Sequence, residues 1–494
     1  MKSNRVMIGL VIGVLFAGTL VCATAAGLGI YFGFGERVEA FFENPTQLIE
    51  EVVSPATEIP ATETPFGADV DLETLFAPVW EARRILHNDF VSQPIDDAIL
   101  AQGALDGLNG ILEQLGVNVA AVDLPSTAPS ARDLADEAQT PADIIDHFLP
   151  FFTIWGQAEY ANLEGLTSYD DLMRASLASM VSSLGDPHTT YLDPVELSQE
   201  ILGLDGEYEG IGAWVDPTGE YLAIIAPMEG SPAEAAGLQP GDIVVAVDGE
   251  DMTGVDGNAV ISRIVGPAGS LVVLTIQRDG SAANFDVEIE RASIFVPSVQ
   301  SEILEGNIAY IQLLTFGAST SIELENALND LLAQNPQGLI LDMRNNGGGF
   351  LHTSVEVTSQ FLSDGIVLIE EFGDGSQQVY EVNEGGLATE INMVVLINGG
   401  SASASEIVAG ALQDTGRATL IGELSFGKAS VQLSPILENG QGALRVTIAH
   451  FLTPNETLLH GVGIAPDIEV EFTQEDADAE IDPQLDAAIE FLSN

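Results

Sequence analysis

The sequence predicts a multidomain α/β protein that has a helical region near its N-terminus and a transmembrane helix before that region. Three observations predict this fold class. From Ile294 onward, apolar strands alternate with amphipathic helices, as in a layered α/β core. Residues 69–184 place small and apolar side chains at helical spacing. Residues 6–35 carry no charged side chain, and a chain of 494 residues has room for several domains.

The charge-free run of residues 6–35 is long enough to span a bilayer, and Lys2 and Arg5 before it place the N-terminus inside. Residues 1–36 are therefore interpreted as a short cytoplasmic start and a membrane anchor. The rest of the chain is expected outside the cytoplasm, at the cell surface or in the periplasm. A cleaved signal peptide is the alternative, because the segment 23–25 (Ala-Thr-Ala) fits a cleavage site, and the protein would then be secreted.

The chain carries 75 acidic and 14 basic residues, a formal net charge of −61. A surface this acidic repels a phosphate backbone, so nucleic-acid binding is excluded as a function. The single cysteine, Cys22, lies in the N-terminal apolar segment, so the chain offers no internal disulfide and no cysteine-based metal site. There is also no HExxH motif, and neither a metal nor another cofactor is expected.

The remaining elements follow in order along the chain. Residues 37–68, with four prolines among Thr, Glu and Ala, predict an extended stalk. Residues 69–204 form the helical region, in which segments 96–112 and 169–186 resemble each other. The aromatic run HFLPFFTIW between them is interpreted as helix core. Residues 205–292 show short β-branched runs bounded by Gly, Pro and Asp, which predict a β domain. Residues 293–494 form the α/β core and a C-terminal tail.

Ser403 lies where a buried strand ends in a Gly-rich turn and runs directly into a helix. Glu406 follows three residues later, so a plain N-cap serine in a capping box is one interpretation. A nucleophile is the other. The two are compatible, because a helix N-terminus presents backbone N–H groups and positive dipole where an oxyanion forms.

Lys428 is the one lysine in the chain besides Lys2, while twelve arginines supply the other basic side chains. Arginine keeps its proton in proteins, whereas a buried lysine can lose its proton and act as a base. A helix, a turn and a strand separate Lys428 from Ser403, and such a unit can return the chain beside its start. Ser403 and Lys428 therefore form a candidate nucleophile–base pair, with Gln432 as the residue that orients the amine.

Two alternatives to this pair remain open. Ser425 and Lys428 form an S-x-x-K motif like that of penicillin-binding enzymes, although its K-T-G companion is absent. His188, in LGDPHTTYL, offers a Ser-His-Asp arrangement, but its neighbour Asp186 is more typical of a rigid turn.

The glycines at 347–349 follow another buried strand and suit an oxyanion hole better than a phosphate loop, because neither G-x-G-x-x-G nor G-K-[ST] is present. Plain turn glycines are the other interpretation.

Seven motifs in this order resemble the carboxy-terminal processing, or tail-specific, serine peptidases. They are LGDPHTTYLDP, YEGIGA, SPAEAAGLQPGDIVVAVDG, LILDMRNNGGGF, NGGSASASEIVAGALQD, GELSFGKASVQ and GVGIAPDIEV. The resemblance covers about residues 165–472. It implies a crotonase-like ββα peptidase core into which a PDZ domain is inserted, and a serine endopeptidase without a cofactor that cuts near exposed C-terminal tails.

The resemblance also implies residue roles. It matches Ser403 to the nucleophile, Lys428 to the general base and Gln432 to the residue that positions the lysine. The backbone N–H groups of Ala404 and Gly348 match the oxyanion hole. The remaining match is a peptide-carboxylate loop in the PDZ domain, made of Gly210, Ile211 and Gly212. Expected partners are proteins or peptides with free C-termini and the membrane, and a homo-oligomer stays possible.

The family pattern is not matched everywhere. Gly347 stands where many members have proline, and the helical region carries two copies of a segment that is usually single. The domain boundaries near that region are therefore the part of the organisation that the resemblance predicts least.

Overall fold

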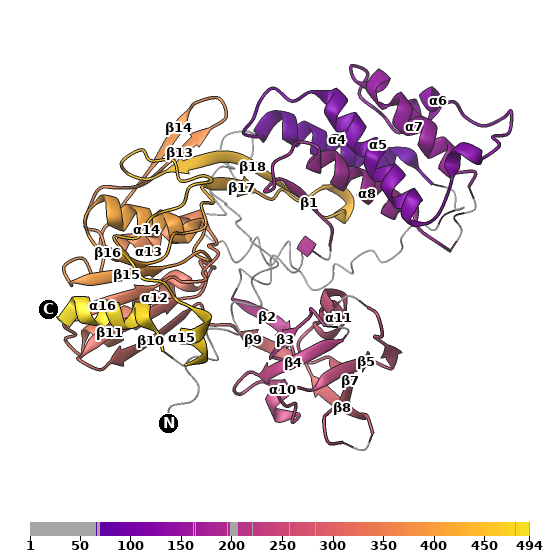
Figure 1. Ribbon diagram of the computed structural model, residues 1–494. Helices are drawn as coiled ribbons and strands as arrows, with labels where there is room; N and C mark the ends of the chain where they lie inside the picture. Colours follow the sequence, from indigo (N-terminus) through magenta and orange to yellow (C-terminus); the bar gives the residue numbers. More distant parts are fainter. Residues whose placement is uncertain are drawn as a thin grey trace.

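The computed structural model describes residues 66, 70–161, 163, 165–194, 196–197, 206–219, 221–255, 257–281, 283–479 and 481–493. The expected anchor and, apart from Phe66, the expected stalk before residue 69 lie outside these residues. Among the helices of the described part, none is long and apolar enough to cross a membrane. Figure 1 shows a helical region in indigo and purple, a β domain in magenta and a larger α/β body in orange and yellow.

The helical region contains α4 (Leu72–Asp89), α5 (Asp97–Gln114), α6 (Ala131–Glu137), α7 (Ile145–Ala158) and α8 (Tyr169–Ser182). Serine side chains begin α6 and α8: Ser130 and Ser168 each accept the backbone N–H of the residue three positions on. The aromatic run of α7 is buried, with the ring of Trp155 edge-on to Phe76 at 4.8 Å between centroids. The interpretation of this run as helix core is confirmed.

The two similar segments, α5 and α8, pack directly against each other (Figure 1). Gly103 and Gly107 of α5 lie at the crossing. A Cβ atom added to Gly107 would lie 2.3 Å from the carbonyl oxygen of Ala175, and one added to Gly103 would lie 2.7 Å from the Cβ of Ser183. The close approach of the two helices therefore depends on residues without side chains at these positions.

The β domain has its own apolar core, which includes Leu222, Val272 and Leu274. One sheet has the strand order β3-β4-β5-β7-β8, with β6 paired to β5. A separate two-stranded ribbon joins the domain to the chain on both sides. The bounds are β2 (Glu207–Gly210), β3 (Ala213–Asp216), β4 (Leu222–Pro227), α10 (Pro232–Ala235), β5 (Ile243–Val247), β6 (Glu250–Asp251), α11 (Gly257–Ile264), β7 (Leu271–Gln277), β8 (Phe285–Glu290) and β9 (Ala292–Phe295).

The ribbon consists of β2 and β9, which run antiparallel with Glu207 opposite Phe295 and Gly210 opposite Ala292. The chain therefore enters and leaves the β domain through two neighbouring strands.

The α/β body is built on a six-stranded sheet of order β10-β11-β12-β15-β16-β19, parallel except for β10. Alternate residues of its buried strands enter two different cores. Leu339 and Leu341 pack with α12–α14, whereas Ile340 packs with α16. The bounds are β10 (Val299–Leu304), β11 (Ile308–Leu313), α12 (Thr320–Leu332), β12 (Gly338–Asp342), α13 (Leu351–Ser359), β15 (Met393–Ile397), α14 (Ala404–Asp414), β16 (Thr419–Gly422), β19 (Ile468–Glu469), α15 (Gln474–Asp478) and α16 (Pro483–Ser493).

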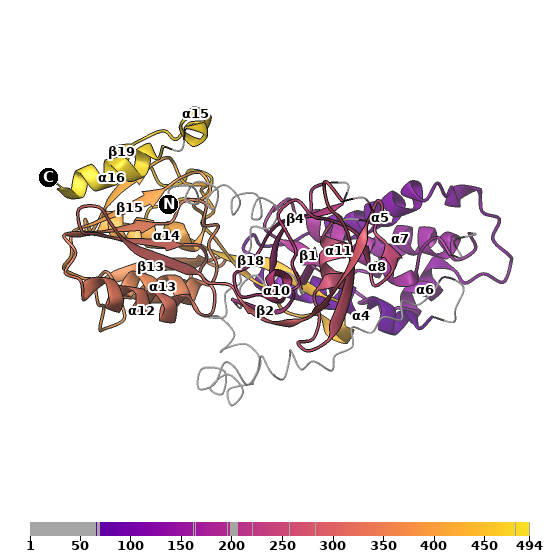
Figure 2. The ribbon, with the colours of Figure 1, turned by 90° about the horizontal axis from the view of Figure 1, so that it is seen from below.

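The α/β body and the helical region share a second sheet, of order β1-β18-β13-β14, in which β17 also pairs with β18. Near its start β18 places Arg445 opposite Thr190 of β1, and near its end it places His450 opposite Glu371 of β13. Figures 1 and 2 show β18 reaching from the α/β body to the helices. The bounds are β1 (Thr190–Leu192), β13 (Ile366–Phe372), β14 (Gln377–Glu381), β17 (Ser430–Leu433) and β18 (Ala443–Leu452).

Candidate active site

Ser403 forms a sharp turn between β15 and α14. Its backbone has φ 56° and ψ −114°, a conformation that a residue with a side chain adopts only under strain. Such a residue costs on the order of 1–3 kcal/mol and persists where its surroundings hold it. Here the backbone carbonyl of Asn346 accepts the N–H of Ala402 at 3.0 Å and the hydroxyl of Ser405 at 2.8 Å, one on each side of Ser403.

A fully buried carboxylate, Glu406, connects the turn of Ser403 with the segment of Lys428. Its Oε2 accepts the backbone N–H of Ser403 at 2.9 Å and that of Lys428 at 2.8 Å. Its Oε1 accepts the hydroxyl of Ser425 at 2.6 Å and the N–H of Gly427 at 2.7 Å. Because one oxygen accepts both N–H groups, the backbone nitrogens of Ser403 and Lys428 lie within two hydrogen-bond lengths of each other in space.

The side chain of Lys428 is among the largest that are fully buried in the described part of the chain, with 1% of its surface exposed. The strand β17 follows, and it places Gln432 in the same buried sheet. The amide nitrogen of Gln432 donates to Ser430 Oγ at 2.8 Å and to Thr447 Oγ1 at 3.3 Å. These two hydroxyls fix the orientation of the amide, so its carbonyl oxygen is the end that is able to receive an N–H from an amine.

Gly348 packs against the turn of the serine. Its φ is +107°, and an added Cβ would lie 2.9 Å from the Cβ of Ser403 and 3.0 Å from the backbone nitrogen of Ala404. No residue with a side chain fits this position without displacing the turn. The glycine loop and the N-terminus of α14 are therefore in direct contact.

The backbone N–H groups of this loop differ in their partners. The N–H of Gly348 donates to the side-chain oxygen of Asn346 at 2.9 Å. In the described part of the chain, the N–H groups of Gly349 and Ala404 make no hydrogen bond. Ala404 thus presents an available donor beside Ser403.

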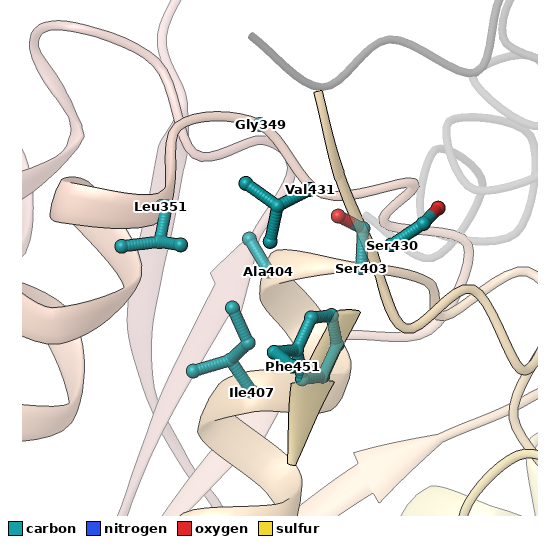
Figure 3. A pocket seen from close by; sticks show the side chains of 8 residues that line it. All are labelled: Gly349, Leu351, Ser403, Ala404, Ile407, Ser430, Val431 and Phe451. Atoms are coloured by element: carbon teal, nitrogen blue, oxygen red, sulfur yellow. The ribbon is translucent and has the colours of Figure 1, made fainter. Parts of the chain in front are cut away.

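A pocket of about 220 Å³, part of it open to solvent, lies beside Ser403. Figure 3 shows the hydroxyls of Ser403 and Ser430 on one side and apolar side chains on the other. The lining residues are Gly349, Leu351, Ser403, Ala404, Ile407, Ser430, Val431 and Phe451. None of these lining residues is charged.

The serine of the S-x-x-K motif is engaged elsewhere. Ser425 Oγ donates to Glu406 at 2.6 Å and accepts the backbone N–H of Ile464 at 2.7 Å. Both bonds are structural and keep the hydroxyl in place between two segments. The geometry therefore favours Ser403 over Ser425 as the partner of Lys428.

His188 lies near the lysine but is not arranged as a triad base. Asp186 accepts its backbone N–H at 3.1 Å and the hydroxyl of Thr189 at 2.6 Å, which is a turn contact and not a contact with the ring. Burial lowers the pKa of His188 to about 4. The imidazole is therefore neutral at neutral pH and a weak base. Its ring packs against His460, with centroids 6.1 Å apart.

The residues of the predicted carboxylate loop lie in the β domain, away from Ser403. Ile211 is buried, and Gly212 has φ +73°, with its carbonyl accepting the N–H of Met228 at 2.9 Å. Burial raises the pKa of the nearby Tyr208, and the backbone N–H groups of Ala213 and Gly212 oppose that effect. The next strand, β3, is the end strand of its sheet and offers an edge for a peptide strand.

The structure thus brings Ser403, Ala404, Gly348 and Lys428 into one site. Gln432 lies on β17, four residues after Lys428. Two residues of the site were not assigned a role in it from the sequence. Glu406 was interpreted only as a capping residue, and its position three residues after Ser403 was the available signal. Asn346 gave no signal beyond its place before three glycines.

Comparisons with known proteins match both the α/β body and the β domain. Residues 307–470 match the family model described as peptidase family S41, and residues 224–278 match that of the PDZ domain. A carboxy-terminal-processing protease of Bartonella bacilliformis is 39% identical over 321 residues, which cover 63% of this chain and 73% of that protein.

Two further relatives match over similar lengths. The carboxy-terminal processing protease CtpB of Bacillus subtilis is 32% identical over 388 residues, covering 77% of this chain and 78% of the relative. A carboxyl-terminal-processing protease of Synechocystis is 35% identical over 327 residues, covering 64% of this chain and 76% of the relative.

Proposed function

Because this chain belongs to the carboxy-terminal processing proteases of peptidase family S41, which are serine-type peptidases, we propose that Ser403 and Lys428 are its catalytic pair. The observation that carries this assignment is the shared carboxylate of Glu406, which holds the strained turn of Ser403 and the segment of the buried lysine on one oxygen atom.

In the proposed reaction, the neutral amine of Lys428 takes the hydroxyl proton of Ser403 as the oxygen attacks the peptide carbonyl. The N–H of Ala404 stabilises the resulting oxyanion. A second donor comes from Gly349, or from Gly348 once it releases Asn346. The C–N bond then breaks as the proton passes from the lysine to the leaving amine. A water molecule, deprotonated by the same amine, hydrolyses the acyl-enzyme. Gln432 orients the lysine throughout.

The uncharged pocket beside Ser403 supports cleavage after small or aliphatic residues.

A fluorophosphonate probe tests the assignment of the nucleophile: it should label the wild-type protein and leave Ser403→Ala unlabelled, while Ser425→Ala is labelled normally. Labelling of Ser403→Ala would mean that another serine is the nucleophile. A catalytically silent scaffold that only binds tails is the second candidate, and absence of any labelling would favour it.

We place the substrates outside the cytoplasm, on the basis of the charge-free N-terminal run, with the body of the protein anchored to the membrane. Digestion of intact cells by an added protease checks this placement, and full protection of the body would contradict it.

The order β10-β11-α12 at the start of the α/β body supports the crotonase-like ββα build.

Recognition of a free C-terminus by the PDZ domain leads to a prediction about peptide ends. A peptide whose terminal carboxylate is converted to an amide should bind about ten- to a hundredfold more weakly, because a hydrogen bond to a charged group contributes roughly 1.5–3 kcal/mol. Fluorescence anisotropy with Ser403→Ala measures the binding without cleavage. Equal affinity for the acid and amide forms of several peptides would show that the loop at Gly210–Gly212 does not hold a carboxylate.

A further inference from the structure

Arg344 stands between the sheet and the glycine loop, and its guanidinium is held by two carboxylates. Asp342, at the end of β12, accepts from Nη2 at 2.6 Å and from Nε at 3.0 Å. Asp482, far along the chain, accepts from Nη1 at 2.9 Å and from Nη2 at 2.8 Å. This is a bidentate pair, the geometry in which an Arg–carboxylate contact is strongest and most directional.

Two uncharged side chains complete the network. Gln484 accepts from Arg344 Nη1 at 3.0 Å, and Tyr310 donates its hydroxyl to Asp342 at 2.8 Å. Burial alone would lower the pKa of Arg344, but Asp342 and Asp482 hold it well above the ordinary value. The ion pairs are therefore intact at any pH at which the carboxylates are charged, and the side chain has little freedom to move.

Asp482 also begins the C-terminal helix. Its Oδ1 accepts the backbone N–H of Leu485 at 2.9 Å, and α16 follows. The far end of α16 packs Leu492 against Gly338, where an added Cβ would lie 2.9 Å from the leucine. The helix is thus attached to β12 at both ends, through Leu492 at the start of the strand and through Asp482 at its end.

The glycine loop begins directly after this clamp. Two residues after Arg344, the carbonyl of Asn346 accepts from Ala402 and from Ser405 on either side of Ser403. The side chain of Asn346 donates to the carbonyl of Leu313 at 2.7 Å, which ties the loop to the neighbouring strand β11. A shift of Arg344 is therefore transmitted through two peptide units to the groups that hold the strained serine.

We propose that Asp482 is a positioning residue for catalysis, which makes the C-terminal helix α16 part of the active-site scaffold. The carboxylate acts through Arg344 and fixes the glycine loop against the turn of Ser403. This inference rests on the proposed nucleophile. It adds a residue that lies 138 positions away from Arg344 along the chain and touches no substrate.

Asp482→Asn tests the proposal. Asparagine keeps the size of the side chain and remains a good helix N-cap, but it loses the charge that pairs with Arg344. We expect kcat for a fluorogenic peptide to fall five- to twentyfold with KM within a factor of two, and fluorophosphonate labelling to slow by the same factor. Asp482→Glu, which restores the carboxylate, should recover part of the rate.

Asp97→Asn is the matched control. Asp97 pairs with Arg83 in the helical region at 2.7 and 2.9 Å, so it has the same bidentate geometry at a distance from the site. It should change the thermal midpoint with kcat unaltered. An Asp482→Asn protein that also shifts only in thermal midpoint would overturn the proposal.

A folding failure can also be separated from a catalytic effect. If Asp482→Asn does not fold, Gln484→Met provides the comparison, because it keeps the helix cap while it removes one bond to Arg344 and the bond from Gln484 to the carbonyl of Val470. An unchanged kcat in Gln484→Met would then count against the proposal. If the wild-type protein itself is not labelled, the proposed nucleophile is wrong, which is a different failure from an unaltered rate in a labelled variant.

Discussion

Lys428→Arg is expected to lower kcat/KM for peptide hydrolysis at least a thousandfold, to the level of Lys428→Ala. Arginine keeps the positive charge and much of the length of the side chain, but a guanidinium does not release its proton and cannot accept the proton of Ser403. Positioned proton transfer contributes about 10²–10⁴-fold to enzymatic rates. Since the same amine serves both acylation and deacylation in the proposed mechanism, its loss should affect both steps. A quenched fluorogenic peptide provides the measurement.

Lys428→Met controls for the change in shape. Methionine fills much of the same buried volume without a charge or a proton, so it should be as inactive as arginine and remain folded. Both variants should still bind tail peptides through the PDZ domain. If Lys428→Arg retained more than a few per cent of the wild-type rate, the lysine would be only a charge, and the proposed mechanism would have to be abandoned.

Glu406→Gln is expected to lower kcat/KM about a hundredfold and also to lower the free energy of unfolding. The carboxylate accepts four hydrogen bonds from three backbone N–H groups and one hydroxyl. A glutamine has one acceptor oxygen, and its own NH₂ group then faces donors. Each buried donor left without a partner costs roughly 1–3 kcal/mol. The turn of Ser403 and the segment of Lys428 lose their common anchor, so the proposed catalytic pair is expected to separate.

Glu323→Gln is the matched control for this change. Glu323 likewise accepts two backbone N–H groups, from Ser298 and Val299, and two hydroxyls, from Ser298 and Ser319, but it lies on α12 and contacts neither Ser403 nor Lys428. It should lower the thermal midpoint and leave kcat/KM within a few-fold of wild type. If Glu406→Gln and Glu323→Gln lost stability and activity in the same proportion, Glu406 would have a structural role only.

Much of the fold could be predicted because the periodicity of the sequence is strong. Buried strands such as β12 and β15 consist wholly of buried residues, and each is followed by glycine and polar residues where the chain turns. The serine of the site was predicted from its place between such a strand and a helix. The lysine was predicted from its rarity, which no local pattern would reveal.

The remaining parts of the site depend on contacts between distant segments. Glu406 fits a capping box in the sequence, and only folding brings Gly427 and Lys428 onto its carboxylate. Asp482 reads as an acidic residue before a C-terminal helix, and its pairing with Arg344 requires α16 to cover the sheet. The hydrogen bond from Gly348 to Asn346 is local, but it depends on backbone angles within a run of glycines, which the residue types leave open.

The β2–β9 ribbon has a consequence for how the PDZ domain is joined to the rest of the chain. Since Glu207 and Phe295 pair directly, the two ends of the insertion are already neighbours in the folded protein. Joining the chain directly across them would therefore cost little loop entropy, because the two ends already lie close together. The PDZ domain is therefore connected to the rest of the chain at one place, through two paired strands. An exchange or removal of the inserted domain would therefore leave the path of the peptidase chain on either side of it unchanged.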